Sequence, residues 1–294
     1  ALAAGVLTRA IVMIVPGVVV CASALGHVPL EMPKGSLVRS LFAYSVPMFA
    51  AVAAGVAFLN LGRISLSMVS SIQAVGVYEA ANRIALILPA AASPILTTAL
   101  PLITARRHED ALVGNVTKVI QEGIGLMTGL LAGALLIVGL PVLGSWIGGP
   151  VSNLGWTLSL LLVAYLLVAG TGPTTVVLRA QGLQWMEAVS LALGTLTMVA
   201  TVFLLAPGAG ALGAAAAIAV GATVNVGILK ATVARKRLTE ATLRIRTLAA
   251  SCSLLLIAGL ASNAAGITRL PVPSSRWILP ATIILAMLTA FLLT

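Results

Sequence analysis

Nine apolar runs, each about 20 residues long, constrain the fold of this chain more than any other feature. A membrane-spanning helix needs about 20 consecutive and mostly apolar residues. The runs cover residues 10–26, 41–62, 78–101, 122–144, 154–176, 188–206, 210–229, 247–266 and 277–294. None of them has the strict alternation of polar and apolar residues that a membrane β-strand requires. The sequence therefore predicts an all-α fold, a polytopic membrane helical bundle of about nine transmembrane helices.

The scarcity of charge excludes the soluble classes of protein. Only 8% of the residues are charged and 60% are apolar, whereas a soluble domain carries about 25% charged residues. A chain with so few charges cannot cover a surface that faces water. A disordered chain needs low hydrophobicity and high net charge, which is the opposite composition.

The net charge of +10 indicates how the chain is oriented across the membrane, rather than a nucleic-acid partner. The odd-numbered loops between the runs hold 12 Lys and Arg residues, and the even-numbered loops hold 3. By the positive-inside rule the odd loops are cytoplasmic. We expect a multi-pass protein of the inner (plasma) membrane, with the N-terminus of this chain outside and the C-terminus cytoplasmic. Residues 230–246 are the most basic loop, which indicates either a topology anchor beside anionic lipid or a specific ligand site.

The third run carries two charges, and a charge inside a membrane helix is functional by default. Glu79 and Arg83 are four residues apart, so they share a helix face and can pair. Tyr78 and Asn82 accompany them. Either the pair neutralises itself near the interface, or Arg83 faces a polar cavity and binds an anion, since arginine suits bidentate contact with phosphate. Arg63 ends the second run on the same side, and either completes a basic patch or caps its helix.

Prolines mark candidate hinges in the same part of the chain. Pro89 and Pro94 interrupt the third run, and Pro47 lies in the second. Proline removes a backbone hydrogen bond and kinks a helix, and broken helices are typical transporter elements. The alternative is the ordinary proline content of membrane helices.

Two features of the later runs predict local structure. Residues 207–209 alone separate the sixth and seventh runs, which predicts a tight turn between antiparallel neighbouring helices. Small residues repeat at intervals of four between Gly210 and Ala217, a pattern that favours close helix packing.

Glu122 and Glu187 stand at the start of the fourth and sixth runs. Each is interpreted either as a solvated residue at a helix end or as a proton relay.

The chain lacks the usual signatures of catalysis. It has no phosphate-binding loop for ATP and no hydrolase, zinc-protease or kinase motif. Cys21 and Cys252 have no metal-ligand spacing, and neither His27 nor His108 has a second ligand nearby. We therefore expect no enzyme, no cofactor and no bound metal.

Three stretches resemble a known family. Residues 74–84, AVGVYEAANRI, resemble the VG-x-Y-x-x-A-x-x-I segment of polysaccharide-type flippases, and residues 94–101 resemble its proline-ended continuation. Residues 178–182, LRAQG, are similar to that family's L-x-A-x-G before a span. Residues 205–215, LAPGAGALGAA, are similar to its LIP-x-x-G-x-x-GAA hairpin. The resemblance, over roughly residues 40–240, is to the O-antigen and polysaccharide flippase branch of the multidrug/oligosaccharidyl-lipid/polysaccharide exporter superfamily.

The resemblance implies a two-lobe protein of which this chain is the C-terminal portion. Two six-helix lobes, often followed by two further helices, enclose a central cavity in that family. The implied parts are the last helix of a missing first lobe at 1–26, an interlobe loop at 27–40, the six-helix second lobe at 41–229, the basic cytoplasmic loop at 230–246 and two additional helices at 247–294. A cleaved signal peptide, or a signal-like segment at residues 1–26, would also explain an N-terminus that lies outside.

The implied function is to flip a polyprenyl-diphosphate-linked oligosaccharide by alternating access. In that case Arg83 and Arg63 attract the diphosphate, with Glu79 beside them. Tyr78 and Asn82 contact sugar or line the cavity. The expected partners are the lipid-linked oligosaccharide, the bilayer and other polysaccharide-assembly proteins. The alternatives are a lipid-II-type flippase, a drug–cation antiporter of the same superfamily, and a non-transporting assembly subunit or transporter remnant.

Overall fold

The computed structural model describes residues 35–105, 110–147 and 154–235, and every element in these ranges is an α-helix. The helices are α2 (Gly35–Val69), α3 (Ile72–Ala85), α4 (Ile87–Ala105), α5 (Asp110–Ile147), α6 (Leu154–Ala180) and α7 (Gln184–Arg235). Five stretches in these ranges, counting α3 and α4 as one, are long and apolar enough to cross a membrane. The all-α fold is thus confirmed for the described part of the chain, and its long apolar helices are consistent with a helical membrane bundle. The predicted runs 10–26, 247–266 and 277–294 lie outside the described residues.

The chain divides into two compact units, Ala1–Ala43 and Tyr44–Thr294. The described part of the first unit is the beginning of α2, Gly35–Ala43. All packing discussed below lies within the second unit.

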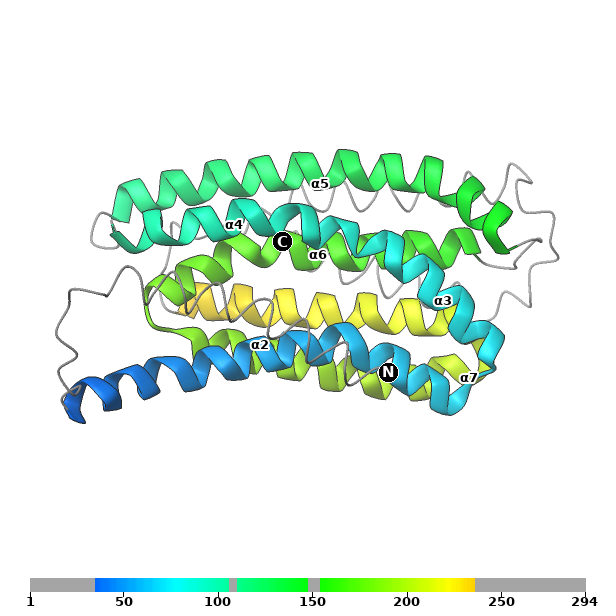
Figure 1. Cartoon of the computed structure of the whole chain (residues 1–294), viewed down its shortest axis with the longest axis horizontal. Helices are drawn as coiled ribbons and strands as arrows, with labels where there is room; N and C mark the ends of the chain where they lie inside the picture. Colours follow the sequence, from blue (N-terminus) through cyan, green and yellow to red (C-terminus); the bar gives the residue numbers. More distant parts are fainter. Residues whose placement is uncertain (1–34, 106–109, 148–153, 236–294) are drawn as a thin grey trace, which may run out of the picture. The chain divides into compact units, whose positions relative to one another are not determined.

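Helix α6 lies at the centre of the second unit. It contacts α3, α4, α5 and α7, and 24 of its 27 residues are buried. Figure 1 shows α4 and α5 on one side of it and α7 on the other. A helix that is apolar all round its circumference buries every face, and α6 has no charged residue before Arg179. Its composition therefore places it inside the bundle.

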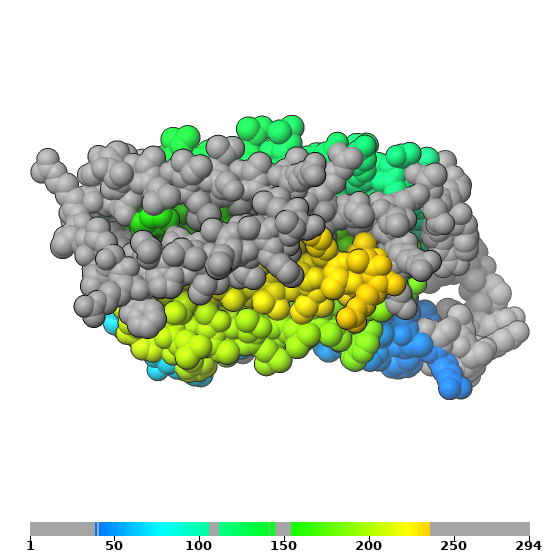
Figure 2. Space-filling view, turned by 180° about the vertical axis from the view of Figure 1, so that it is seen from behind, coloured from blue at the N-terminus to red at the C-terminus, as the bar shows by residue number. Residues whose placement is uncertain are grey.

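Helix α7 is a hairpin of two arms rather than one straight rod. Gly210 has φ 53° and ψ −128°, a left-handed conformation that glycine adopts without strain. A Cβ added to Gly221 would lie 2.7 Å from the carbonyl oxygen of Gly194. In a straight helix these two residues would be about 40 Å apart, at ~1.5 Å per residue. The antiparallel pair predicted around residues 207–209 is confirmed, and both views show the arms side by side (Figures 1 and 2).

The third predicted run, 78–101, is two helices instead of one. Helix α3 begins at Ile72, where Ser71 caps it by accepting a hydrogen bond from the backbone N–H of Ala74. It ends at Ala85, and Leu86 separates it from α4. The break falls three residues before Pro89, whose ring clashes with the carbonyl one turn earlier and whose nitrogen donates no hydrogen bond.

The other candidate hinges lie inside continuous helices. Pro94 lies within α4, and α2 runs through Pro47 from Gly35 to Val69. Movement about Pro47, Pro89 and Pro94 stays a prediction, because a break in one conformation is not a motion.

The connection between α6 and α7 is a tight glycine cap. The backbone N–H of Leu183 donates to the carbonyl of Leu178 at 2.8 Å, and that of Gly182 to the carbonyl of Arg179 at 3.1 Å. Gly182 has φ 75°. This is the Schellman arrangement, in which a glycine in left-handed conformation ends a helix. It brings the last turn of α6 beside the first turn of α7.

Close packing of the α7 arms predicts a specific sensitivity to one methyl group. In Gly221→Ala the new Cβ would lie 2.7 Å from both the Gly194 carbonyl oxygen and the Cβ of Met198. We expect a loss of about 1–3 kcal/mol of stability, as for other overpacked cores. Thermal unfolding of the full-length protein in detergent measures this loss.

The matched control is Gly227→Ala on the same arm, where an added Cβ meets nothing within 4 Å. Both substitutions gain the same helix propensity, about 1 kcal/mol in favour of alanine. The difference between them therefore measures the cost of the close contacts at Gly221, which are with the first arm and, at 3.3 Å, with Phe58 on α2. Equal unfolding temperatures for the two variants would contradict the close packing.

Candidate functional site

Three charged side chains from α2 and α3 form a cluster, which we call the cation cluster: Arg63, Glu79 and Arg83. Oε1 of Glu79 accepts from Nη1 of Arg63 and from Nε of Arg83, both at 3.4 Å. The pairing of Glu79 with Arg83 that their spacing predicted is present. Arg63 joins because α2 ends at Val69 and α3 starts at Ile72, so Arg63 and Glu79 each lie about two helical turns from the connection between the two helices.

The cation cluster retains the capacity to bind an anion. Two guanidinium groups share one carboxylate, which leaves one positive charge uncompensated. Both contacts are long and monodentate, and the side chains of Arg63 and Arg83 are 47% and 70% exposed in the isolated chain. Exposed pairs of this kind contribute about 0–1 kcal/mol. Each guanidinium has five N–H groups, so most of its donors remain for a ligand such as phosphate.

Tyr78 and Asn82 are core residues of the described bundle. Tyr78 is fully buried and Asn82 is 5% exposed. The hydroxyl of Tyr165 on α6 donates to Oδ1 of Asn82 at 2.7 Å, which ties α3 to α6. The hydroxyl of Tyr78 packs against Gly62 on α2. Both side chains pack α3, the helix that carries Glu79 and Arg83, against its neighbours α6 and α2, and their direct contact with a substrate stays a prediction.

A second ion pair was not predicted from the sequence. Nε and Nη2 of Arg179 donate to Oε2 and Oε1 of Glu187, at 2.8 and 2.6 Å. The interpretation of Glu187 as a solvated end residue is wrong, because the residue is only 3% exposed. The glycine cap at Gly182 turns α7 back so that its first turn faces the end of α6. An acid in a first turn and a base in the preceding last turn, with glycine between, is the signal that could have revealed this pair.

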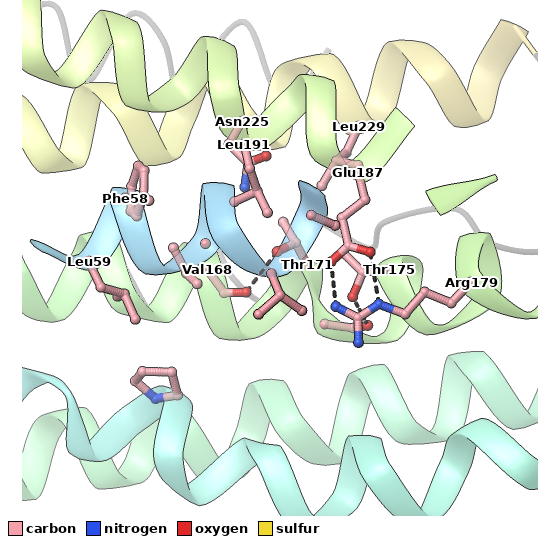
Figure 3. Close-up of a pocket in the computed structure, with 15 residues that line it drawn as sticks. Phe58, Leu59, Val168, Thr171, Thr175, Arg179, Glu187, Leu191, Asn225 and Leu229 are labelled. Atoms are coloured by element: carbon pink, nitrogen blue, oxygen red, sulfur yellow. Dashed lines mark hydrogen bonds and ion pairs between the residues drawn. The ribbon is translucent and has the colours of Figure 1, made fainter. Parts of the chain in front are cut away.

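A cavity of about 220 Å³ lies beside this ion pair, and we call it the α6 pocket. Figure 3 places Phe58 and Leu59 at one end and Arg179 with Glu187 at the other. Its walls come from α2, α4, α6 and both arms of α7. The lining residues are Ala51, Val52, Gly55, Phe58, Leu59, Pro89, Val168, Thr171, Gly172, Thr175, Arg179, Glu187, Leu191, Asn225 and Leu229.

The polar groups of the α6 pocket are arranged to accept hydrogen bonds. Thr171, Thr175 and Arg179 recur every four residues, so they follow one face of α6. The two hydroxyls donate to the carbonyls of Val168 and Gly172, which leaves their oxygen lone pairs as acceptors. Asn225 is 2% exposed, and its Oδ1 has no hydrogen-bond partner within the described part of the chain. An unsatisfied buried acceptor costs about 1–3 kcal/mol, so a site for a donor is indicated there.

The described residues contain no group of three or more His, Cys, Asp or Glu side chains that could hold a metal ion. Cys21, Cys252, His27 and His108 lie outside the described residues.

The long apolar helices, taken together with the family match that follows, indicate a transporter-like membrane protein. Residues 1–106 match the model of the polysaccharide biosynthesis protein family, which is consistent with a polysaccharide biosynthesis or flippase family member. The matched region includes α2, α3 and α4, and therefore the whole cation cluster. No curated protein and no solved structure matches the chain.

The two ion pairs should respond differently to mutation. Arg179→Leu leaves the Glu187 carboxylate, 4% exposed, without its partner, and we expect about 3–5 kcal/mol of destabilisation. Glu79→Gln should change stability by at most about 1 kcal/mol, because its arginines are exposed. Thermal unfolding of the full-length protein in detergent compares the two.

The double variant Arg179→Leu/Glu187→Leu completes the comparison. It removes both charges, so we expect it to recover most of the stability lost by Arg179→Leu alone. If the double variant is as unstable as the single one, the buried carboxylate is not the cause of the loss.

Proposed function

We propose that the protein flips a polyprenyl-diphosphate-linked oligosaccharide, a precursor of cell-surface polysaccharide, across the cytoplasmic membrane. The observation that carries this proposal is the cation cluster of Arg63, Glu79 and Arg83 on apolar helices within the family-matched region. A net positive site with free guanidinium donors suits a diphosphate, which offers several charged oxygen acceptors. The family match supports polysaccharide biosynthesis as the process that the ligand serves.

The single carboxylate of the cluster fits this role. Glu79 holds the two arginines near each other while the site is empty, which lowers their mutual repulsion. Its contacts at 3.4 Å are weak enough for a phosphate to replace them. By contrast, the bidentate and buried pair of Arg179 and Glu187 is already satisfied. Among the arginines of these two ion pairs, Arg63 and Arg83 are therefore the ones suited to bind the diphosphate.

Alternating access requires a second wall opposite the cluster. In the proposed arrangement residues 41–229 form one six-helix lobe, and a first lobe supplies that wall. The break at Leu86 separates the helix that carries Arg83 from α4, which supports a moving part close to the ligand.

The environment of the acids disfavours the drug–cation antiporter. Such a protein needs a membrane-embedded carboxylate that is available to a cation. Glu79 and Glu187 are both engaged by arginine. An anionic ligand is the better match.

Replacement of either cluster arginine should strongly lower transport in the full-length protein. We expect Arg83→Ala and Arg63→Ala each to lower export of the lipid-linked glycan about tenfold or more, because a hydrogen bond to a charged group contributes about 1.5–3 kcal/mol. Arg83→Lys should retain part of the activity, since lysine keeps the positive charge but lacks the planar guanidinium group that binds phosphate through two N–H donors. Surface glycan and precursor on the inner leaflet are the measurements, and the precursor that accumulates distinguishes this branch from a lipid-II flippase.

Arg235→Ala is the matched control, because it removes one exposed cation from the last turn of α7, away from the cluster. It should leave export unchanged. Normal export by Arg83→Ala and Arg63→Ala at normal protein level would overturn the proposal and favour a non-transporting assembly subunit.

A further inference from the structure

We propose that the α6 pocket binds a sugar ring of the lipid-linked oligosaccharide next to its diphosphate. This inference rests on the proposed function, and it assigns a separate site to the neutral part of the same ligand. Three observations carry it: the position of the pocket relative to the cation cluster, its neutral charge, and its unsatisfied acceptor.

The pocket and the cation cluster lie along the same two helical segments. On α2, Arg63 comes one turn after the lining residue Leu59, a rise of about 6 Å. Val52 and Arg63 are eleven residues apart, about three full turns, so they share one face of α2. On the opposite wall, Pro89 follows Arg83 by six residues across the break at Leu86. A phosphate held by the arginines is therefore within one or two helical turns of the pocket.

The end of the pocket near Leu59 is the end that adjoins the cation cluster. Figure 3 places Arg179 and Glu187 at the far end, beyond Thr171 and Thr175. Along the walls, the cation cluster is thus followed by the apolar end at Phe58 and Leu59, then by the threonine hydroxyls, and last by the neutral ion pair. A diphosphate attached to a sugar has the same order of charged and neutral parts.

The charge of the pocket selects a neutral ligand. Both oxygens of Glu187 bind Arg179, so the pair presents no net charge. A phosphate would gain nothing there over the cation cluster, and a cation would meet the guanidinium. A neutral molecule with hydroxyl groups suits the site, because it can donate to Oδ1 of Asn225 and to the threonine oxygens.

The volume favours a single ring. The cavity of about 220 Å³ is smaller than the ~300–1,000 Å³ of sites that enclose drug-sized ligands, and a single pyranose ring is a ligand of matching size. Apolar lining residues such as Leu59, Pro89 and Val168 provide surfaces for the C–H faces of the ring.

Binding measurements on the full-length protein in detergent test the assignment. The probes are a short-chain prenyl diphosphate and the same lipid carrying one N-acetylglucosamine, glucose or galactose. We expect the wild-type protein to bind at least one glycosylated probe more tightly than the bare lipid. The double variant Asn225→Leu/Thr171→Val should weaken binding of that probe about tenfold, since two hydrogen bonds of about 0.5–1.5 kcal/mol each are lost, and should leave the bare lipid unaffected.

Two further variants separate a binding role from a structural one. Thr197→Val removes a hydroxyl that also donates to its own helix backbone but lies exposed and outside the pocket, so it should change neither affinity. Thr171→Ser keeps the hydroxyl and should bind like wild type. Thermal unfolding of each variant checks that it is folded.

The outcomes distinguish this inference from the proposed function. Arg83→Ala should weaken both kinds of probe. If binding of the bare lipid depends on Arg83 but the pocket variants and the sugar make no difference, the pocket holds only water and this inference fails alone. If the wild-type protein binds no probe, or binds them independently of Arg83, the proposed function fails and this inference fails with it.

Discussion

The placement of a few charges in an apolar bundle governs the rest of this structure. A charge away from water is stable only when a partner and hydrogen bonds compensate it. The chain uses two arrangements. Glu187 and Arg179 satisfy each other through two short bonds in a buried setting, which fixes the connection between α6 and α7. Glu79 is shared by two exposed arginines at longer distance, which leaves donors available. The first arrangement is a structural clamp, and the second is suited to a ligand.

Local backbone features were the most predictable part of the fold. The turn at residues 207–209 follows from proline and glycine between two apolar runs, and the structure has its left-handed glycine at Gly210. The break in the third run follows from Pro89, although its position at Leu86 depends on the clash one turn earlier. Helix α3 starts at Ile72, six residues before the predicted run, because Ser71 caps it there.

Features that depend on tertiary packing could not be predicted from periodicity. Helix α6 is apolar on every face, so its sequence indicates burial but not which helix each face contacts. The pairing of Glu187 with Arg179 depends on the glycine cap at Gly182, which the apolar runs taken alone do not reveal. The sequence predicted one of the two ion pairs of the candidate site. The pairing of Glu79 with Arg83 follows from their spacing, whereas the third partner, Arg63, depends on how α2 and α3 meet. The burial of Tyr78 and Asn82 depends on α6, which no local pattern reveals.

The break at Leu86 lies between residues of the two proposed sites. Arg83 of the cation cluster lies on α3, before the break, and Pro89 of the α6 pocket lies on α4, after it. Arg63 and Leu59, by contrast, lie on the uninterrupted α2. A change of the angle between α3 and α4 therefore alters the distance between Arg83 and Pro89. The distance between Arg63 and Leu59 stays the same, because both lie on α2. A ligand that spans both sites, with charge at one and hydroxyls at the other, would bind best at one angle only. Its affinity would then favour one conformation of the broken helix, which is the condition for a ligand to shift a conformational equilibrium.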